Sequence, residues 1–355
     1  MRYIFILGRN VELSIEEVKS FLKRIGNAVR SLKRRKNAIL VETEKHIHEK
    51  IIHKLGGVIA FGEIVDIHKE ELYFGTSNKM NYVIWEFCDK PDCEKIRSHL
   101  KRRLKADGLK ATEKKLGRMI KLQDGETAST LSTRHIDEQF FVFDGEFGRI
   151  NQICDYEAIE KRDMQKPVRR SELSISPRLS KIMINLSEVK QGKLLDAFCG
   201  VGVILSEALL QKISVIGVDK DKKALEGAKH NLEWQGFNKE DYKLIKADSR
   251  NVGIPDCEVM VSEPDLGEIL KKMPAKEKAE ETLRKFNSLM IGVINNVKDN
   301  IAGRIVFTAP YIKTNQGKIG CDAEEIAVRT RKELVLKIPE YRENQIVGRE
   351  VIVLE

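Results

Sequence analysis

The pattern of apolar and polar positions gives the first half of the chain a mixed α+β character. An apolar run at residues 3–7 predicts a strand, and residues 14–17, Ser-Ile-Glu-Glu, have the order of a helix capping box before apolar residues at helical spacing. A strand at 38–41, a helix at 47–55 and an extended segment at 58–67 follow. These elements are typical of a small ferredoxin-like module, which we assign to residues 1–72.

A second α+β unit is predicted for residues 73–158. Its predicted elements are an extended segment at 82–87, a basic helix at 93–105 and strands near 119–122 and 139–142. The segment 160–170 that follows is polar, highly charged and contains Pro167. It therefore predicts an exposed connection between domains.

Strands and helices alternate regularly in residues 159–355. Apolar periodicity predicts helices at 177–186, 203–211 and 222–235, with strands at 193–197, 214–218, 243–246, 259–261 and 304–308. Segments 333–338 and 346–354 predict a closing antiparallel hairpin. The alternation indicates a doubly wound, Rossmann-like α/β domain with a parallel sheet.

Composition and charge limit the partners of this chain of 355 residues. Lys and Arg number 63 against 54 Asp and Glu, and the net charge of +9 favours a polyanion, although a membrane surface would fit the charge alone equally well. No apolar stretch is long enough to span a membrane. The six cysteines have no C-x-x-C pair, so we expect reduced thiols in a cytoplasmic protein, without a zinc ribbon or disulfide framework.

A metal site is not predicted. His46, His48 and His53 lie close together in sequence, with Glu49 beside them, but they miss the H-E-x-x-H spacing that places two ligands on one helical face. A solvated helix is the favoured interpretation of this segment.

The densest chemical signal lies where the strand at 193–197 meets the next helix. Residues 194–202 read Leu-Leu-Asp-Ala-Phe-Cys-Gly-Val-Gly, in which Gly200 and Gly202 permit a tight turn and the close approach of a ligand to the backbone. Neither the G-x-G-x-x-G fingerprint nor a phosphate-binding P-loop is present. Asp219 and Asp248 end the next two strands. Each acid alone fits a helix N-cap, but acids at three successive strand ends favour a nucleoside site.

These residues resemble a known family. The turn from Asp196 to Gly202, followed by Asp219 and Asp248, looks like the signature of S-adenosylmethionine-dependent amino-methyltransferases. Residues 162–186 and 7–14 are similar to the corresponding segments of THUMP-containing tRNA guanosine N2-methyltransferases that act at position ten. The resemblance is strong over 160–250 and weakest over 75–155, where a THUMP-like domain is inferred mainly from its place in the chain.

The resemblance implies a class I methyltransferase domain, S-adenosylmethionine as cofactor, tRNA as substrate and, for some relatives, a small zinc-binding activator subunit. It also implies the cofactor-binding residues, which are Ser176, Asp196, Phe198, Cys199, Gly200, Gly202, Asp219, Lys220, Asp248 and Ser249. In this scheme Asp219 binds the ribose and Asp248 binds the adenine. Cys199 is expected to pack against the turn, since no histidine near it in sequence would activate a nucleophile.

The chain departs from the family at the catalytic motif. Relatives have Asp/Asn-Pro-Pro-Tyr or Ser/Thr-Glu-Pro-Tyr-Leu-Gly, whereas Ser262, Glu263, Pro264 and Asp265 form the motif here. The first residue and the following carbonyl are expected to accept the N–H groups of the target amine, and the fourth residue normally stacks on the flipped base. An aspartate cannot stack. The departure predicts weaker guanosine binding, an aromatic supplied by another segment, or lost activity.

Three aromatic residues are candidates to replace the missing ring: Phe198, Tyr311 and Tyr341. The role of Glu263 is open between a general base, a helix N-cap and a surface acid. Trp85 and Trp234 are expected to be core or helix-packing residues.

Two basic clusters lie in the first half of the chain. A solvated basic face is one interpretation, but their position outside the cofactor domain favours RNA docking through phosphates and shape. The predicted RNA-binding residues are Arg34, Arg35, Lys36, Arg102, Arg103, Lys114, Lys115 and Arg118.

Three functions therefore need to be distinguished. The leading prediction is a tRNA guanine-N2 methyltransferase. The second is a catalytically impaired RNA-binding paralogue that has lost the motif aromatic at Asp265. The third, a methyltransferase for DNA or for a small molecule, leaves the N-terminal half unexplained.

Overall fold

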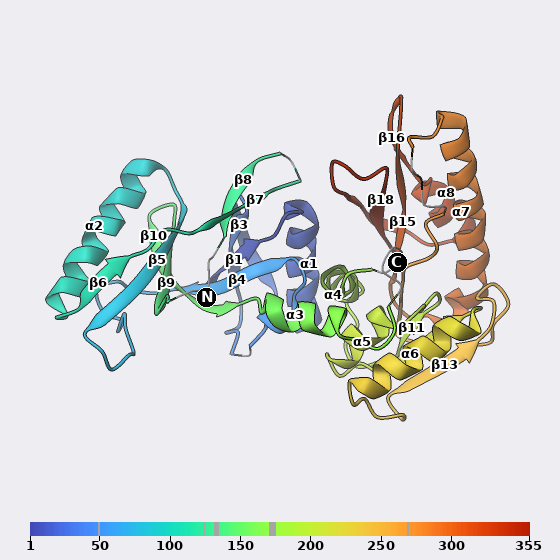
Figure 1. Cartoon of the computed structure of the whole chain (residues 1–355), viewed down its shortest axis with the longest axis horizontal. Helices are drawn as coiled ribbons and strands as arrows, with labels where there is room; N and C mark the ends of the chain where they lie inside the picture. Colours follow the sequence, from blue (N-terminus) through green and yellow to red (C-terminus); the bar gives the residue numbers. More distant parts are fainter. Residues whose placement is uncertain (49, 124, 131–134, 170–174, 268–269, 271) are drawn as a thin grey trace. The chain divides into compact units, whose positions relative to one another are not determined.

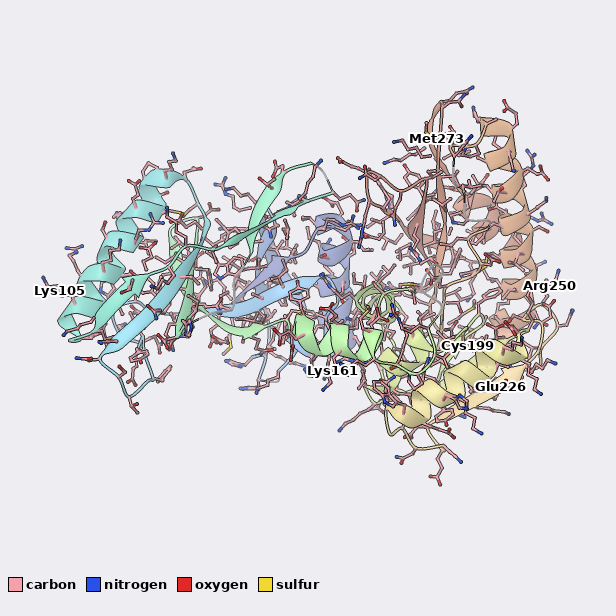
Figure 2. All side chains as sticks on the ribbon, viewed as in Figure 1. Lys105, Lys161, Cys199, Glu226, Arg250 and Met273 are labelled. Carbon is pink, nitrogen blue, oxygen red and sulfur yellow. A yellow bond between two sulfur atoms is a disulfide. The ribbon has the colours of Figure 1, made fainter. Side chains whose placement is uncertain are left out.

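The computed structural model divides the chain into two compact units (Figures 1 and 2). The structure describes all residues except 49, 124, 131–134, 170–174, 268–269 and 271. For residues 118, 119, 129 and 130 it describes the backbone but not the side chains. Unit 1 contains Met1–Ile15, Gly26–His53 and Gly57–Asp155, and unit 2 contains Glu16–Ile25, Lys54–Gly56 and Tyr156–Glu355.

Unit 1 is built on one eight-stranded sheet in the order β2-β3-β1-β4-β10-β9-β5-β6. In the middle of this sheet β4 pairs antiparallel with β10. Strands from residues 1–72 and strands from residues 73–158 therefore share one sheet. The division of this half into two domains stays a prediction. The strands are β1 Arg2–Leu7, β2 Val29–Arg35, β3 Ala38–Thr43, β4 Val58–Ile64, β5 Lys79–Phe87, β6 Lys110–Glu113, β9 Glu138–Phe143 and β10 Glu146–Ile153. A separate hairpin pairs β7 Arg118–Lys121 with β8 Thr127–Thr130.

The first helix, α1 Val11–Arg24, begins one turn before the predicted capping box. Asn10 is the residue that caps it, since its Oδ1 accepts from Leu13 N at 3.2 Å. Ser14 lies inside the helix, where its hydroxyl donates to Asn10 O at 2.6 Å. The predicted capping box is therefore wrong.

The predicted helix at 47–55 is also wrong, since helical geometry among its described residues is limited to the 3-10 turn η1, Ile52–Lys54. The N–H groups of Ile51 and Ile52 donate to Gln152 Oε1 at 2.8 and 3.0 Å instead of to helical carbonyls. A side chain of β10 thus takes the hydrogen bonds that a helix would have used.

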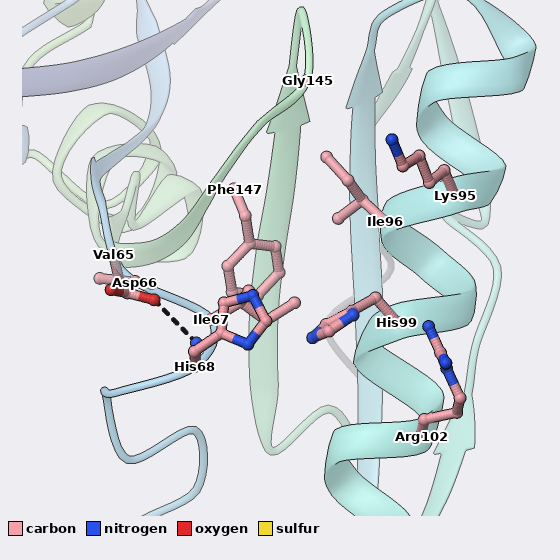
Figure 3. A pocket seen from close by; sticks show the side chains of 10 residues that line it. All are labelled: Val65, Asp66, Ile67, His68, Lys95, Ile96, His99, Arg102, Gly145 and Phe147. Atoms are coloured by element: carbon pink, nitrogen blue, oxygen red, sulfur yellow. Dashed lines mark hydrogen bonds between the residues drawn. The ribbon is translucent and has the colours of Figure 1, made fainter.

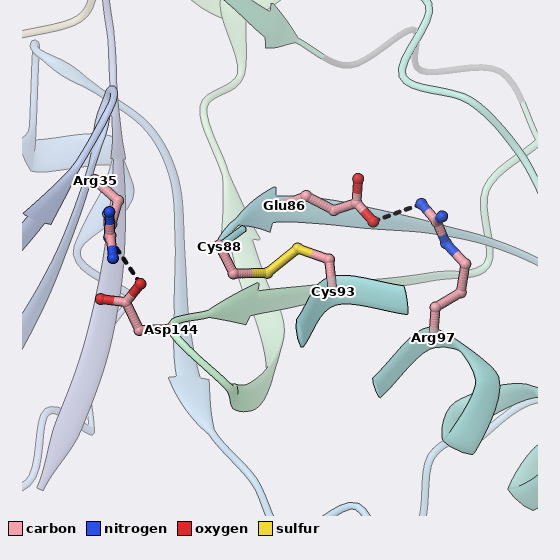
Figure 4. The surroundings of a disulfide bond; sticks show 6 residues. All are labelled: Arg35, Glu86, Cys88, Cys93, Arg97 and Asp144. Atoms are coloured by element: carbon pink, nitrogen blue, oxygen red, sulfur yellow. Dashed lines mark hydrogen bonds and ion pairs between the residues drawn. A yellow bond between two sulfur atoms is a disulfide. The ribbon is translucent and has the colours of Figure 1, made fainter. Parts of the chain in front are cut away.

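The second helix, α2 Lys90–Ala106, covers β5 and β9 with Leu100 and Leu104. Trp85 is 1% exposed, which confirms it as a core residue. Cys88 and Cys93 are joined by a disulfide at the start of this helix (Figure 4), so the expectation of reduced thiols is wrong for this pair. The other four cysteines are free and buried.

The connection between the predicted domains is helical over its first part. The helix α3, Tyr156–Met164, overlaps the segment that was expected to be an exposed linker. The Oδ1 atom of Asp163 accepts a hydrogen bond from Lys166 Nζ at 2.7 Å, and the Lys166 side chain is only 6% exposed. The segment is thus largely exposed, as expected, except at Lys166, which is buried.

Unit 2 contains the predicted doubly wound sheet, in the order β13-β12-β11-β14-β15-β18-β17. The strands from β13 to β15 are parallel, and β18 and β17 form the predicted antiparallel hairpin. The bounds are β11 Leu194–Asp196, β12 Val215–Asp219, β13 Tyr242–Lys246, β14 Val259–Ser262, β15 Ile305–Thr314, β16 Gly317–Gly320, β17 Leu334–Glu340 and β18 Val347–Leu354. Strand β16, which was not predicted, extends β15 as a hairpin.

The helices of unit 2 are α4 Pro177–Leu186, α5 Val203–Leu209, α6 Lys222–Trp234, α7 Lys276–Val297, η2 Lys298–Asn300 and α8 Ala323–Thr330. The bounds predicted for α4 are confirmed, whereas α7 was not predicted. Its buried residues Phe286 and Met290 pack with Phe307 of β15 in the main core of this unit. Trp234 is 46% exposed, so its expected packing role is wrong. Within the described ranges, no helix is both long and apolar enough to span a membrane.

Candidate functional site

The turn between β11 and α5 depends on two glycines with left-handed backbone conformations. Gly200 has φ +50° and Gly202 has φ +84°. A Cβ atom on Gly200 would meet no described atom within 4 Å, whereas one on Gly202 would lie 3.3 Å from Ala228 Cβ in α6. Gly200 thus leaves open space at the turn, and Gly202 allows the turn to pack on a helix.

Asp219, at the end of β12, is bonded directly to this turn. Its Oδ2 accepts from Gly200 N at 2.9 Å, and its Oδ1 accepts from Asp221 N at 2.9 Å. The neighbouring Lys220 is exposed. The structure therefore brings together the predicted glycine turn and the second predicted acid, which are 19 residues apart.

Asp248 follows β13 and pairs with Arg250, which was not among the predicted site residues. Arg250 Nε lies 3.0 Å from Asp248 Oδ1, and its Nη2 lies 2.6 Å from Oδ2. This guanidinium holds the pKa of Asp248 well below its usual range. The i, i+2 spacing was the only sequence signal for the pair. The adjacent Ser249 is buried, and its hydroxyl donates to Ala197 O in the turn.

Asp196 is almost completely buried at the end of β11. Burial raises the pKa of its carboxyl from 3.8 to about 7, opposed by the hydrogen bonds from Phe198 N and the Ser262 hydroxyl. The N–H group of Phe198 lies 3.1 Å from Asp196 Oδ1. Cys199 beside it is 5% exposed, and burial raises the pKa of its thiol well above the usual value, which fits packing better than nucleophilic attack.

Ser262 joins the predicted catalytic motif to the cofactor turn. Its side chain is completely buried, and its Oγ accepts from Ala197 N at 2.7 Å while the hydroxyl also bonds the Asp196 carboxylate. The hydroxyl thus holds the ends of β11 and β14 together. Its predicted contact with the target amine stays a prediction.

Glu263 forms an ion pair with the C-terminal hairpin. Its Oε1 accepts from Arg349 Nε of β18 at 2.5 Å, and its side chain is 9% exposed. Burial raises the pKa of this carboxyl, while Arg349 and the N–H group of Ile175 oppose the rise. Glu263 is therefore neither a surface acid nor a helix N-cap.

The remaining motif residues form the last part of the loop after β14. Pro264 is buried and Asp265 is exposed. The Oδ1 atom of Asp265 accepts from Gly267 N at 3.0 Å, which closes a short turn. Asp265 is thus the member of the motif that is open to solvent.

Ser176 lies at the start of α4. Its Oγ accepts from Leu179 N at 3.2 Å and caps the helix, and the residue is exposed. The preceding Ile175 donates its N–H group to Glu263. The N-terminus of α4 is therefore beside Glu263, as a role in the same site requires.

The predicted RNA-binding residues differ in how far their charge is already neutralised. Arg34 pairs with Glu12 at 2.6 Å and Arg35 with Asp144 at 2.7 Å, both in surface contacts (Figure 4 shows the second). Arg103 is paired with Asp107 and also donates to two backbone carbonyls. Exposed members that form no ion pair with any described residue are Lys36, Arg102, Lys114 and Lys115, and the Arg118 side chain lies outside the described residues.

Arg102 lines a cavity of about 370 Å³ in unit 1, which was not predicted (Figure 3). Two histidines face each other in it: His68, from the loop after β4, and His99 of α2 have ring centroids 4.5 Å apart. Burial lowers the pKa of His99, as do the charges around it. These histidines are far apart in sequence, so no motif could have indicated their contact.

Among the described residues, no three His, Cys, Asp or Glu side chains are grouped so that they could hold a metal ion. The acids at the strand ends bind backbone N–H groups or arginine instead. The site thus presents hydrogen-bond acceptors.

Comparison with known proteins shows what residues 167–293 are similar to. Residues 167–293 match the UPF0020 family, described as an RMKL-like methyltransferase domain. The tRNA (guanine(10)-N2)-dimethyltransferase of Methanothermobacter thermautotrophicus is 35% identical over 142 residues, which are 39% of this chain and 39% of that protein. The protein of the same name from Methanocaldococcus jannaschii is 28% identical over 244 residues, 62% of this chain and 65% of that one.

Each of these matches spans less than two thirds of the relative. The crystal structure of TrmN from Thermus thermophilus aligns over 100% of this chain and 99% of its own, with 12% identity and a TM-score of 0.49. Residues 167–293 therefore match a methyltransferase-domain model of the UPF0020 family, and the chain is similar to the tRNA (guanine(10)-N2)-dimethyltransferases over part of their length.

Proposed function

We propose that the protein is an S-adenosylmethionine-dependent tRNA methyltransferase that acts on the exocyclic N2 of a guanosine, at position ten as in the names of its relatives. The observation that carries the proposal is the contact of Asp219 with the glycine turn, directly beside the buried joint of Asp196 and Ser262. In this proposal, the cofactor binds at the same end of the sheet that carries the predicted catalytic motif.

The residues of this edge fit the cofactor. Space is open where a Cβ of Gly200 would lie, so a ligand could approach the backbone there. Each Asp219 oxygen accepts one backbone bond and keeps a lone pair for a ribose hydroxyl. Asp248 would accept the adenine amino group while Arg250 fixes its orientation. When bound, the cofactor supplies an electrophilic methyl group.

The motif residues would position the target amine. Ser262 and Glu263 are held by the turn and by Arg349, so the backbone between them is fixed. We assign the acceptance of the amine N–H groups to the backbone carbonyls of this segment, with Ser262 as a positioning residue. Alignment of the amine with the methyl group is the main requirement of direct transfer.

Calorimetric titration with S-adenosylmethionine tests the cofactor site. We expect the wild type to bind and Asp219→Ala to lose binding, because the variant loses both the ribose acceptor and the bond to Gly200. Asp221→Ala is the matched control, since that acid caps α6 by accepting from Lys223 N at 2.9 Å and should leave binding intact. A folded wild type that binds no cofactor would refute the proposal.

The RNA substrate and the partner need a separate test. Methyl transfer from labelled cofactor to total tRNA, with and without a small zinc-binding activator subunit, should give a labelled N2-methylated guanosine on mass mapping. Label in duplex DNA or in small molecules but not in tRNA would exclude the tRNA assignment.

One observation favours a second candidate, the catalytically impaired RNA-binding paralogue. The exposed motif position that would meet the base is Asp265, which has no ring. If the wild type transfers no methyl group to tRNA and Asp265→Tyr does, the paralogue is the better description.

A further inference from the structure

The base that a nucleic-acid-modifying enzyme extrudes is usually held by stacking on aromatic or apolar side chains. Asp265 offers no ring, and three aromatic residues were candidates to replace it. Phe198 packs against the main core of unit 2 and is thereby engaged. Tyr311 and Tyr341 are not members of that core, and both are partly exposed.

These two tyrosines form a pair at the end of the sheet. Their ring centroids are 5.6 Å apart with planes inclined at 45°. Lys318 of β16 places its Nζ 3.2 Å from the Tyr341 centroid and 6.0 Å from that of Tyr311. Two rings and an ammonium group thus lie together, which are the groups that bind a base and its phosphate in single-stranded complexes.

Glycines lie opposite Tyr311 on both neighbouring strands, and one of them leaves room for Tyr341. Tyr311 of β15 lies opposite Gly348 of β18 and Gly320 of β16. A Cβ on Gly348 would be 2.6 Å from Tyr341 Cβ, so this glycine is what permits Tyr341 to approach. A Cβ on Gly320 would clash with the Glu350 carboxylate, which is also one of the charges that raise the pKa of Tyr311.

The pair lies on the same face of the sheet as the loop that follows the catalytic motif. Arg349, which binds Glu263, lies opposite Pro310 on β15, so strand alternation places its side chain on the other face of the sheet from Tyr311. Phe307 and Ala309 of β15 pack in the core with α7, and strand alternation places Tyr311 on the same face. The loop that carries Asp265 turns to this face as well, since a Cβ on Gly267 would lie 3.2 Å from Thr282 of α7.

We propose that Tyr311 and Tyr341 form the stacking platform for the extruded target base, with Lys318 close to its phosphate, in place of the ring that Asp265 lacks. This inference rests on the proposed function. It assigns to two hairpins, β15–β16 and β17–β18, the part of base recognition that the motif itself does not provide.

The test uses the full-length protein and four variants in two pairs. Tyr311→Leu and Tyr341→Leu remove the rings but keep apolar volume, while Tyr311→Phe and Tyr341→Phe keep the rings and remove the hydroxyls. Trp234→Leu is the matched control, because it removes an exposed ring from α6 of the same unit. Circular dichroism and cofactor calorimetry verify that each variant is folded and binds S-adenosylmethionine as the wild type does.

Two readouts are measured: kcat/KM for methyl transfer to tRNA, and the affinity for a short single-stranded RNA that contains guanine. Each leucine variant should lower both by about 5- to 100-fold, as expected when one stacked ring is removed. The phenylalanine variants and the control should stay within about twofold of the wild type in both readouts. This change is smaller than the loss expected when one stacked ring is removed.

The outcomes separate this inference from the proposed function. If the wild type binds no cofactor and transfers no methyl group, the function fails, while the affinity for single-stranded RNA still decides whether the rings stack. Leucine variants that match the wild type in both readouts would overturn the inference. So would equal losses in the leucine and phenylalanine variants, which would assign the effect to the hydroxyls.

Discussion

Asp196 is expected to make the stability of the protein depend on pH between about 4 and 7. Its pKa is about 7 in the folded state against an ordinary value of 3.8, because the carboxyl is buried. The unfolded chain therefore releases this proton at lower pH than the folded chain does. The protonated carboxyl contributes on the order of 4 kcal/mol to the free energy of unfolding. This contribution is complete below pH 4 and is lost as the pH rises through 7.

Urea unfolding of the wild type and of Asp196→Asn across this pH range measures the effect. Because the amide does not titrate, the variant should gain stability relative to the wild type as the pH rises from 4 to 7. A difference between the two proteins that stays constant with pH would show that Asp196 is ionised in the folded state.

Ser262 and Thr308 offer a matched comparison of two buried hydroxyls. The Ser262 hydroxyl accepts from Ala197 N, whereas the Thr308 Oγ1 atom is buried without a hydrogen-bond partner among the described residues. Ser262→Ala should lower the free energy of unfolding by about 1–3 kcal/mol, because it leaves buried polar groups unpaired. Thr308→Val should be neutral or stabilising, and chemical denaturation of both variants measures the difference. Equal losses would contradict the assigned bonds.

The residue types of the site were predictable, but their partners were not. Asp196, Asp219 and Asp248 stand out because each lies at the end of a predicted strand or just after it, and strand ends converge on one edge of a parallel sheet. Arg349 lies 86 residues from Glu263, and their ion pair depends on the antiparallel return of β18. Contacts at that separation depend on topology, which periodicity does not specify.

At the scale of elements, Gly202 and Gly236 test the glycine turn. Both have positive φ, but a Cβ on Gly202 would press on Ala228, while one on Gly236 would meet no described atom within 4 Å. Each alanine substitution should cost about 1–2 kcal/mol for the left-handed conformation. Gly202→Ala should lose more, since Ala228 must also move, and should weaken cofactor binding. Thermal unfolding and calorimetry measure both effects.

A Gly202→Ala protein that is as stable as Gly236→Ala and binds the cofactor with wild-type affinity would contradict this description of the turn.

Elements were predictable where local pattern and tertiary packing agree. The helix α4 has the predicted bounds because its apolar stripe and its Ser176 cap act together. The segment 47–55 has helical spacing too, but Gln152 takes its N–H groups and its isoleucines are buried without a helix. The long α7 was missed because its first half is highly charged and Gly292 interrupts its apolar second half. Tertiary contacts thus overrode local preference in one case and supported it in another.

At the scale of the whole molecule, the basic residues of unit 1 predict the salt dependence of RNA binding. Lys114 and Lys115 are exposed, so their replacement by serine should remove phosphate contacts. The slope of log K against log salt concentration should decrease in magnitude by about 0.7–0.9 for each phosphate that is no longer neutralised. The same double substitution at Lys222 and Lys223 of α6 is the control for net charge.

Filter binding of tRNA over a salt series measures the slopes. Identical slopes for the two double variants would show that net charge, and not a surface of unit 1, governs RNA binding.

The pairing of β4 with β10 has a consequence for how the protein is made on the ribosome. Strand β4 ends at Ile64, but its partner begins at Glu146, and β4 joins the two groups of strands of the sheet. Glu16–Ile25, which include most of α1, are grouped with Tyr156–Glu355. Until β10 has been synthesised, β4 therefore has an unpaired edge, and the strands of other chains could pair with it. Slow translation or a chaperone at this stage should affect the yield of folded protein more than any later event.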